Sequence, residues 1–312
     1  MAKTCLQSVT FPSRGLRIAA RLYTPPVEAA NRKQAAIIVG HPVSGVKEQA
    51  AGLYARQLAD AGFVTLTFDA AYQGDSEGSP RGLEDPYRRV EDFKYAATYL
   101  SNLDKDLVDR RRIGVVGICG AGGYVPFAAQ TDLRMRAVAT VSATCLGDLT
   151  RLSLDGGPAV AVVTPSLLAA QLQEAGRRRT ARDDERMPTL PEDFADIPVE
   201  MPERSMLKEA WSYYKTSRAG HPRAPLLEVA WGVDLRANYD SFHFIHMISP
   251  RPWLMIAGGD ADTANQSRRA IETAEEPKEL FITEGKSHVD LYDDTSKTVP
   301  KLIDFMSKAL CS

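Results

Sequence analysis

The sequence predicts an α/β protein built on a mostly parallel β-sheet with helices on both of its faces. Short, strongly apolar runs alternate with segments whose apolar residues recur at helical spacing, which is the pattern of strands connected by crossover helices. The alternation fails only between about residues 147 and 232. With 312 residues, the chain is long enough for one large domain of this class that carries an insertion.

The predicted elements follow one another in a regular order from the N-terminus. LQSVTF and LRIAARLY, joined by the turn residues 12–15, predict a β-hairpin. Six further strands are predicted from the apolar runs AAIIVG, FVTLTFD, RIGVVGI, RAVATVSA, PWLMIAG and KELFIT, because strands buried in a parallel sheet tend to be apolar on both faces. Helices are predicted at 48–61, 85–103, 120–130, 263–274 and 294–310, which completes an eight-stranded sheet flanked by helices.

The span that breaks the alternation is predicted to be a helical cap. It contains SLLAAQLQEAGRRR, the proline-interrupted MPTLPEDFADIPVEMPERS and MLKEAWSYYKTS. We therefore divide the chain into a core, residues 1–147 and 233–312, and a cap of residues 148–232. Insertions at the carboxyl end of such a sheet commonly cover the active site. The alternative is a decorative or dimerising insertion, which leaves a homodimer open.

Composition and charge narrow the expected partners. Hydrophobic residues make up 44% and charged residues 25% of the chain, and the net charge is −2, so neither nucleic acid nor an anionic membrane is an expected partner. No apolar run approaches the ~18 residues of a membrane helix, and the first residues lack the apolar core of a secretion signal. Four cysteines without C-x-x-C spacing indicate a reducing, cytoplasmic setting. No spacing of His, Cys or Asp suggests a metal, and no cofactor is predicted.

One cysteine lies where a predicted strand turns into a predicted helix. In GICGAGGY, Cys119 follows the strand, and Gly117 and Ala121 on either side have almost no side chain. The pattern glycine-x-nucleophile-x-small residue at such a turn is typical of a nucleophile elbow. The N-terminus of the following helix is expected to favour a thiolate and to face a developing oxyanion. A buried packing cysteine is the alternative, whereas a dinucleotide-binding turn fails because the glycines are not spaced G-x-G-x-x-G.

A nucleophile of this kind needs a base and an acid that orients the base. Two acids, Asp260 and Asp262, follow the strand PWLMIAG, and His288 lies in the loop after the strand KELFIT. The chain order nucleophile, acid, histidine is the order found on this type of sheet. Because each candidate follows a strand, all of them are expected at the carboxyl edge of the sheet.

Several blocks of the sequence resemble the α/β-hydrolase superfamily, and more narrowly its dienelactone-hydrolase-like and fungal polyketide-transferase-like group. The blocks are GHPVSGVKEQAAGLYA, FDAAYQGDSEGSPR, LEDPYRRVED, GICGAGGY, AGGDADT and SHVDLYD, and they are spread over nearly the whole chain outside the insertion. The resemblance implies an α/β-hydrolase fold with Cys119 as the nucleophile, His288 as the base and Asp262, rather than Asp260, as the acid.

The predicted reaction is acyl transfer by this Cys-His-Asp triad. Cys119 attacks the carbonyl of an ester, thioester or lactone, and the resemblance implies that the N–H groups of Val43 and Gly120 hold the oxyanion. Water, or another hydroxyl or amine, then releases the acyl group, for which the resemblance implies a polyketide origin in secondary metabolism. A biosynthetic acyltransferase or cyclase with the same triad is the first alternative, and a non-hydrolytic ligand-binding protein is the second. A redox sensor is disfavoured because no cysteine lies near Cys119 in the sequence.

The cap is expected to provide the walls of a pocket for a small-molecule acyl substrate. A large acyl group gains binding chiefly from apolar burial, and the core presents only small residues there. Trp211, Tyr213 and Tyr214 are the predicted substrate-binding residues, and a tyrosine hydroxyl can also donate a hydrogen bond that orients the substrate. Further apolar candidates from the cap are Leu167, Leu168, Leu172 and Trp231. The alternative for each is packing of the cap onto the sheet or onto a partner subunit.

Overall fold

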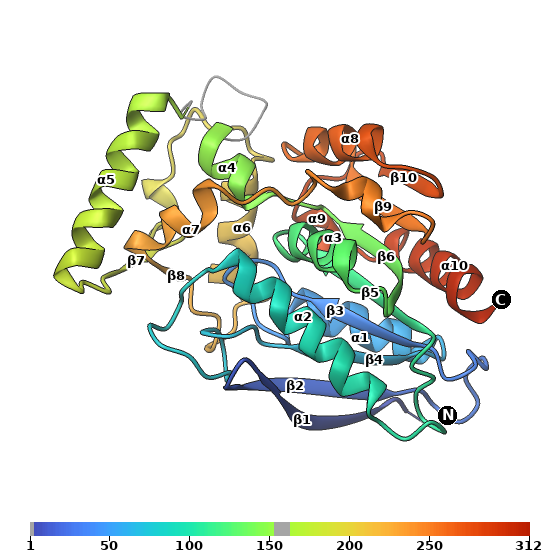
Figure 1. Cartoon of the computed structure of the whole chain (residues 1–312). Helices are drawn as coiled ribbons and strands as arrows, with labels where there is room; N and C mark the ends of the chain where they lie inside the picture. The colour runs from blue at the N-terminus through green and yellow to red at the C-terminus, as the bar shows by residue number, and fades with distance from the viewer. Residues whose placement is uncertain (1–2, 153–162) are drawn as a thin grey trace.

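The chain is organised around an eight-stranded β-sheet with the strand order β1-β2-β4-β3-β5-β6-β9-β10 (Figure 1). The structure, a computed structural model, describes residues 3–152 and 163–312. The strands are β1 Cys5–Ser13, β2 Leu16–Thr24, β3 Ala36–Gly40, β4 Val64–Phe68, β5 Ile113–Ile118, β6 Met135–Val141, β9 Trp253–Gly258 and β10 Lys278–Thr283. β1 and β2 form the predicted hairpin, β2 pairs antiparallel with β4, and the other neighbours pair in parallel. The predicted mostly parallel, eight-stranded sheet is confirmed.

The register of the parallel strands brings their carboxyl ends together at one edge of the sheet. Gly40 at the end of β3 is level with Gly117 in β5, and Ile118 at the end of β5 is level with Val141 at the end of β6. The last residues of β9 and β10 are also paired with each other. The loops that follow these strands therefore begin side by side, which is where parallel sheets of this type carry their sites.

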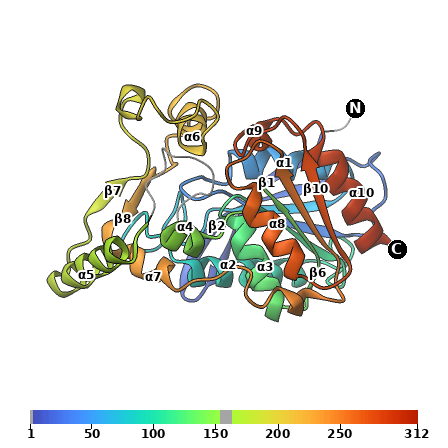
Figure 2. The same ribbon diagram turned by 90° about the horizontal axis from the view of Figure 1, so that it is seen from above.

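Helices cover both faces of the sheet, as predicted. The helices α2 Pro86–Ser101, α3 Ala121–Thr131 and α8 Ala264–Thr273 lie on one face, and α1 Ala50–Asp60 and α10 Thr298–Cys311 lie on the other (Figures 1 and 2). The predicted helices are present to within a few residues at each end. The largest difference is that α10 begins later than predicted, because a short helix, α9 Asp290–Asp293, precedes it. Asp294 then accepts hydrogen bonds from the backbone N–H and the hydroxyl of Ser296, which fixes a turn between the two helices.

The region between β6 and β9 is more varied than the helical cap that the sequence predicts. It contains the helices α4 Leu146–Leu152, α5 Pro165–Ala181, α6 Met206–Lys215 and α7 Val233–Ala237, the short 3₁₀ helices η1 Phe194–Asp196, η2 Ala230–Gly232 and η3 Ile245–Ile248, and an antiparallel pair of strands, β7 Arg186–Pro188 and β8 Leu227–Val229. Because α7 packs against α4 and α5, the region continues past the predicted boundary at residue 232. It lies at one side of the sheet (Figures 1 and 2). The division into a core and a cap stays a proposal.

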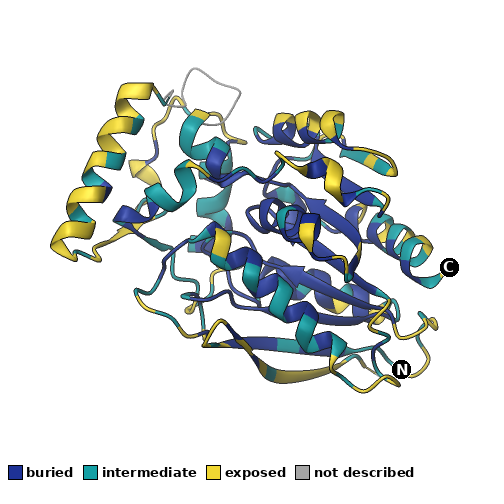
Figure 3. Cartoon of the chain, in the orientation of Figure 1, coloured by how far each residue is buried: buried dark blue, intermediate teal, exposed yellow. Residues whose placement is uncertain are grey.

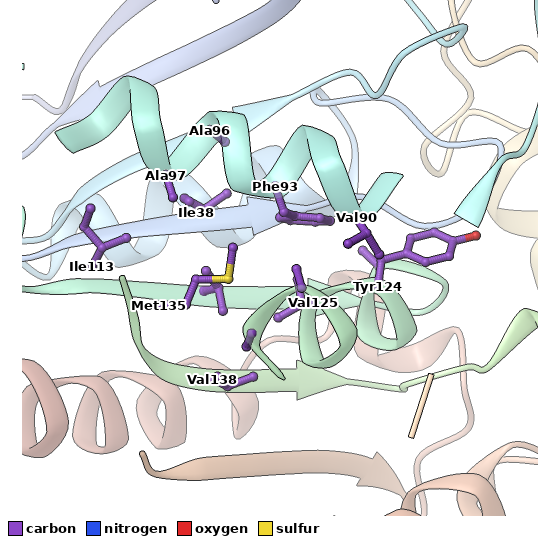
Figure 4. Close-up of a cluster of buried hydrophobic side chains, with 14 of the residues drawn as sticks. Ile38, Val90, Phe93, Ala96, Ala97, Ile113, Tyr124, Val125, Met135 and Val138 are labelled. Atoms are coloured by element: carbon purple, nitrogen blue, oxygen red, sulfur yellow. The ribbon is translucent and has the colours of Figure 1, made fainter. Parts of the chain in front are cut away.

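Apolar side chains fill the space between the sheet and the two helical layers, and the central strands are buried along most of their length (Figure 3). On one face, Val90 and Phe93 of α2 lie in the same cluster as Ile38 of β3 and Val138 of β6 (Figure 4). The buried residues of α1 and α10 form the cluster of the other face, which also includes Cys119. Helix α5, by contrast, is exposed along most of its length. Among the helices in the described ranges, none is long and apolar enough to cross a membrane.

Candidate active site

Cys119 occupies a strained turn between β5 and α3. Its backbone φ is 56°, in the left-handed region that a non-glycine residue rarely adopts and that is often found at functional sites. The turn is fixed by a hydrogen bond from the Cys119 N–H to the carbonyl of Val141 (3.0 Å) and by one from the Gly122 N–H to the carbonyl of Cys119 (2.8 Å). A Cβ atom on Gly117 would lie 2.2 Å from the carbonyl oxygen of Ala121. The local geometry expected of a nucleophile elbow is therefore present, and it requires glycine before the cysteine.

Two backbone N–H groups are hydrogen-bond partners of the Cys119 thiol. They belong to Gly120 and Val43, and the hydrogen bonds from both lower the pKa of the thiol. The loop that carries Val43 is held by the buried ring of His41, which is hydrogen-bonded through Nδ1 to the carbonyl of Pro42 (2.7 Å) and through Nε2 to the backbone N–H of Ala70 (3.2 Å). Burial keeps the pKa of His41 well below its usual value, so the ring is neutral. These are the two N–H groups that the resemblance implied for an oxyanion hole, and that role stays a prediction.

His288 lies in the loop after β10 and is almost fully buried, with 1% of its surface exposed. Its Nδ1 atom is hydrogen-bonded to the hydroxyl of Thr263 at 2.6 Å, and its Nε2 atom to the hydroxyl of Tyr292 at 3.0 Å. The backbone carbonyl of His288 also accepts a hydrogen bond from the Ser142 hydroxyl (2.9 Å). The histidine is thus fixed at both ring nitrogens, and the carboxyl edge of the sheet brings it close to the elbow.

The contacts of the expected triad differ from those that the sequence predicts. Direct hydrogen bonds from His288 to Cys119 and to Asp262 are not found among the described residues. The Asp262 carboxylate instead accepts a hydrogen bond from the backbone N–H of Met206 (2.9 Å), the first residue of α6. Helix N-termini attract carboxylates because their first N–H groups have no partner within the helix. Thr263, the next residue, is therefore the one whose side chain reaches the imidazole.

The other candidate acid, Asp260, lies farther from the site. Its carboxylate accepts a hydrogen bond from the guanidinium of Arg204 (2.7 Å), and nearly half of its side chain is exposed. Arg204 also pairs with Asp290. Asp260 therefore connects the loop after β9 to the segment before α6, and the structure gives it no contact with His288 among the described residues.

Burial dominates the electrostatics of the site. Burial raises the pKa of the Cys119 thiol, and hydrogen bonds from Tyr292, Gly120, Thr144 and Val43 only partly offset this effect. Burial also lowers the pKa of His288 to about 3, because a charged imidazolium would be poorly solvated there. The N–H of Gly120 at the helix N-terminus favours the thiolate, as expected, but burial has the larger effect on the pKa of the thiol. At neutral pH the thiol and the imidazole are both uncharged.

Tyr292 and Thr263, whose hydroxyls contact the ring of His288, were not among the candidates predicted from the sequence. Tyr292 belongs to the SHVDLYD block, and it follows His288 by four residues, the spacing that places two side chains on one face of a helical turn. That spacing is a signal from which Tyr292 could have been found. No comparable signal marked Thr263, because its role depends on how the loop after β9 meets α6.

The three predicted substrate-binding aromatics separate into two groups. Tyr213 and Tyr214 are buried in the same cluster as Cys119 and Tyr292, and their rings contact each other edge-on at 4.9 Å between centroids. The Tyr214 hydroxyl is buried and has no hydrogen-bond partner among the described residues. Trp211, by contrast, packs edge-on against Phe194 of η1 and donates a hydrogen bond to the carbonyl of Pro191 (3.2 Å).

Other apolar candidates from the cap also contribute to packing within that region. The guanidinium of Arg179 lies 3.9 Å from the ring centroid of Trp231, and the Trp231 indole N–H donates to Asp184 (2.9 Å). Trp231 thus belongs to a small cluster with Ala175 of α5. Leu167 is exposed. Among these two candidates, Trp231 therefore stabilises the region itself.

A cavity of about 380 Å³ lies next to the elbow. It begins at Val43, and its other lining residues come from α4, α5, β7, β8, α7 and the adjoining loops. The apolar part of the lining comprises Val43, Leu146, Leu149, Val163, Pro188 and Val233, and the polar part comprises Thr150, Gln171, Thr189, Glu228 and Arg236. This volume is within the usual range for small-molecule sites. Within the described ranges, no group of three or more His, Cys, Asp or Glu side chains is placed to hold a metal ion.

The sheet order, the helical layers and the elbow at the end of β5 together define an α/β hydrolase. The sequence model of the alpha/beta hydrolase family matches residues 33–299 of the chain. The chain therefore belongs to this family, and the predicted α/β-hydrolase fold is confirmed.

Two bacterial relatives match over most of their length. The chain is 37% identical over 284 residues to the uncharacterized protein YcjY of Escherichia coli (strain K12), covering 89% of each chain. It is 38% identical over 296 residues to the uncharacterized protein PA2218 of Pseudomonas aeruginosa, covering 94% of this chain and 77% of that protein. The crystal structure of PA2218 superposes with a TM-score of 0.89 over 99% of this chain and 95% of that chain.

A fungal relative is named as a transferase. The polyketide transferase GrgF of a Penicillium species is 23% identical over 257 residues, covering 81% of each chain. Its crystal structure superposes with a TM-score of 0.79 over 99% of this chain and 100% of that chain, at 20% identity. At this identity the likeness establishes the shared fold. The chain is thus an α/β-hydrolase-family enzyme with a relative named as a polyketide transferase.

Proposed function

We propose that the protein is an acyl-transfer enzyme in which the sulfur of Cys119 attacks the carbonyl carbon of an ester, thioester or lactone. The observation that carries the proposal is the environment of this one sulfur. It sits on a left-handed residue at a strand–helix turn, and the N–H groups of Gly120 and Val43 are directed at it. A cysteine that only filled space would need neither the strained φ nor two convergent donors. Each donor of this kind stabilises an oxyanion by roughly 3 kcal/mol in comparable enzymes.

His288 is the proposed base. As Cys119 attacks, the thiol proton has to move to Nε2 of His288. In this proposal the Nδ1–H of His288 donates to the Thr263 hydroxyl, so Nε2 carries no proton and can accept one. In this proposal Asp262, the acid of the expected triad, acts indirectly. Its hydrogen bond with the start of α6 holds the turn from which the Thr263 side chain reaches His288. Water or a second hydroxyl or amine then attacks the acyl-enzyme, and the same histidine assists that step.

The lining of the cavity next to Val43 indicates the substrate class. Aliphatic side chains offer burial for a chain of several carbons. The threonine, glutamine and Glu228–Arg236 groups offer partners for oxygen atoms along that chain. We therefore propose an oxygenated acyl chain, such as a polyketide-derived one, as the substrate. The name of the fungal transferase is consistent with this class.

The test is to trap the acyl-enzyme. The purified protein is incubated with small aryl esters and acyl thioesters, and its intact mass is followed with time. An increase equal to one acyl group, mapped to Cys119 and absent from Cys119→Ala, supports the proposal. The partly exposed Cys5 and Cys311 provide an internal control for non-specific acylation. Turnover that persists in Cys119→Ala would show that the reaction does not use this sulfur.

A further inference from the structure

The hydroxyl of Tyr292 lies between the two groups that have to exchange a proton. It is 3.0 Å from Nε2 of His288, and the edge-on His288 and Tyr292 rings have centroids 5.5 Å apart. The same hydroxyl is also a hydrogen-bond partner of Cys119, and as a donor to the ionised sulfur it lowers the pKa of the thiol. Tyr292 is 3% exposed and Cys119 is 8% exposed, so bulk water has little access to the gap between sulfur and imidazole.

We propose that Tyr292 is a catalytic residue that relays the proton between Cys119 and His288. This inference rests on the proposed function. In the resting site the thiol S–H donates to the Tyr292 oxygen, the Tyr292 O–H donates to Nε2, and Nδ1–H donates to Thr263. As the bond between Sγ and the substrate carbonyl carbon forms, the S–H proton passes to the phenol oxygen and the phenol proton passes to Nε2. Tyrosine is regenerated, and the imidazolium later returns its proton by the same route to the leaving oxygen or sulfur as that atom departs.

The position of Tyr292 is fixed by its surroundings. Its ring contacts the ring of Tyr213 edge-on, with centroids 5.2 Å apart. The adjacent carbonyl of Leu291 accepts a hydrogen bond from the Tyr54 hydroxyl (2.5 Å). The titratable groups that face Tyr292 are therefore Cys119, His288, Tyr213 and Tyr214, and at neutral pH all of them are uncharged. A relay that never creates a free thiolate or a lasting charge suits a site with these surroundings.

The experiment compares Tyr292→Phe with Tyr54→Phe, using the same esters as the acylation test. Tyr292→Phe keeps the ring and removes the relay, so kcat/KM falls by at least ~100-fold. The alkylation of Cys119 by iodoacetamide, followed at that peptide by mass spectrometry, also slows at pH 8. Tyr54→Phe removes a buried hydroxyl of α1 that donates to the carbonyl of Leu291, next to Tyr292. It lowers the melting temperature while leaving the solvent isotope effect and the alkylation rate unchanged. A larger solvent isotope effect in the wild type than in Tyr292→Phe is the expected signature of two protons in motion.

A fluorinated tyrosine at position 292 covers the case in which Tyr292→Phe does not fold. This residue keeps the hydroxyl but makes it more acidic. If the hydroxyl relays a proton, kcat/KM changes with the acidity of the phenol, whereas a purely structural hydrogen bond leaves kcat/KM unchanged. One outcome is that Cys119→Ala is inactive but Tyr292→Phe keeps kcat/KM within about three-fold of the wild type. Such a loss is too small for a general acid–base group. The relay is then overturned, and the proposed function stands. If Cys119→Ala is active, the proposed function itself fails.

Discussion

The hydroxyl of Thr263 lies 2.6 Å from Nδ1 of His288, in the place where a triad acid is expected. A neutral hydroxyl orients the ring but stabilises an imidazolium less than a carboxylate does. This agrees with a site in which burial lowers the pKa of His288 to about 3. The site therefore favours proton movement that is coupled to attack over a preformed ion pair of thiolate and imidazolium.

The first prediction separates Thr263 from Asp262. Thr263→Val keeps the shape of the side chain but leaves Nδ1–H buried without a partner, which costs about 1–3 kcal/mol. We expect kcat/KM to fall by roughly 10- to 100-fold as the ring loses its fixed orientation. Asp262→Asn retains an oxygen that accepts from the Met206 N–H, and we expect it to stay within about three-fold of the wild type, as for a residue outside the proton path.

Steady-state kinetics on one ester, with melting temperatures for each variant, checks this prediction. The contrary result is a loss of roughly 10⁴-fold in Asp262→Asn, the size found when a true triad acid is replaced by its amide. Together with a mild effect of Thr263→Val, it would show that Asp262 orients the ring in the working enzyme.

The second prediction concerns the unpartnered hydroxyl of Tyr214. Because this buried oxygen has no partner among the described residues, its removal in Tyr214→Phe relieves a desolvation cost and should not lower the melting temperature. If the hydroxyl contacts the substrate, KM for an oxygenated acyl substrate rises by roughly 10-fold, corresponding to one lost hydrogen bond. Activity on an unsubstituted acetyl ester stays unchanged.

The matched control is Tyr23→Phe. The Tyr23 hydroxyl is also buried without a partner in the described part of the chain, but it belongs to β2. Both variants should therefore have the stability of the wild type, and only Tyr214→Phe should change KM. An equal KM in the two variants would remove Tyr214 from the substrate site.

The features that the sequence predicted correctly are those set by local geometry and burial. The strands and helices were found because their apolar pattern reflects burial on both faces of the sheet. The tight turn at Cys119 was found because it needs small residues at fixed spacing, and a Cβ on Gly117 would meet the carbonyl of Ala121. His288 was proposed from the order of residues along the chain, which the topology of parallel strands fixes, and its role as the base stays a prediction.

The residues that were missed have roles set by contacts between distant segments. Whether Asp262 or Thr263 reaches the imidazole depends on the start of α6, because the Met206 N–H attracts the carboxylate. The cavity is lined partly by α4 and the β7–β8 pair, whereas the sequence pointed to the aromatic residues of the cap. An aromatic residue of the cap can line a pocket or pack within the cap, and the sequence does not distinguish the two cases. Trp231, for example, packs against the guanidinium of Arg179.

The third prediction is a dependence of stability on pH that comes from His288. Its pKa is about 3 when folded and ~6.5 when unfolded, so the unfolded chain binds the proton more tightly. The stability that comes from the neutral imidazole is therefore fully present above about pH 6.5 and is lost as the pH falls toward 3. At pH 5 the loss in the free energy of unfolding is about 2 kcal/mol. His41 is shifted in the same direction, also by burial. Urea unfolding from pH 7 to 5 should thus be less steeply pH-dependent in His288→Gln than in the wild type.

The same shift predicts how activity depends on pH. Because free His288 is not protonated until the pH approaches 3, kcat/KM should show no acid limb near ~6.5, the ordinary histidine value. The rate is measured between pH 5 and 8 on an ester whose own ionisation lies outside this range. An acid limb with a midpoint near 6.5 that disappears in His288→Gln would contradict the burial of the imidazole in the working enzyme.

The last prediction tests the cavity beside Val43 as the acyl site. Leu149 on α4 lines this cavity, and Leu149→Trp fills part of it. Each methylene that can no longer be buried costs about 0.8 kcal/mol. An eight-carbon acyl ester that loses the burial of two or three methylenes should therefore lose roughly 10- to 100-fold in kcat/KM. The acetyl ester, which ends before the cavity, should react at the wild-type rate.

The control is Leu152→Trp on the same helix. Leu152 is exposed and does not line the cavity, so an added indole there should leave both esters unaffected. The ratio of kcat/KM for the long ester to that for the acetyl ester is the decisive quantity, because it cancels any general loss of folded protein. If Leu149→Trp lowers both rates equally, or if both tryptophan variants shift the ratio by the same amount, the acyl chain binds elsewhere. A selective drop in Leu149→Trp alone places the acyl chain next to Val43, within reach of the N–H groups that face the sulfur of Cys119.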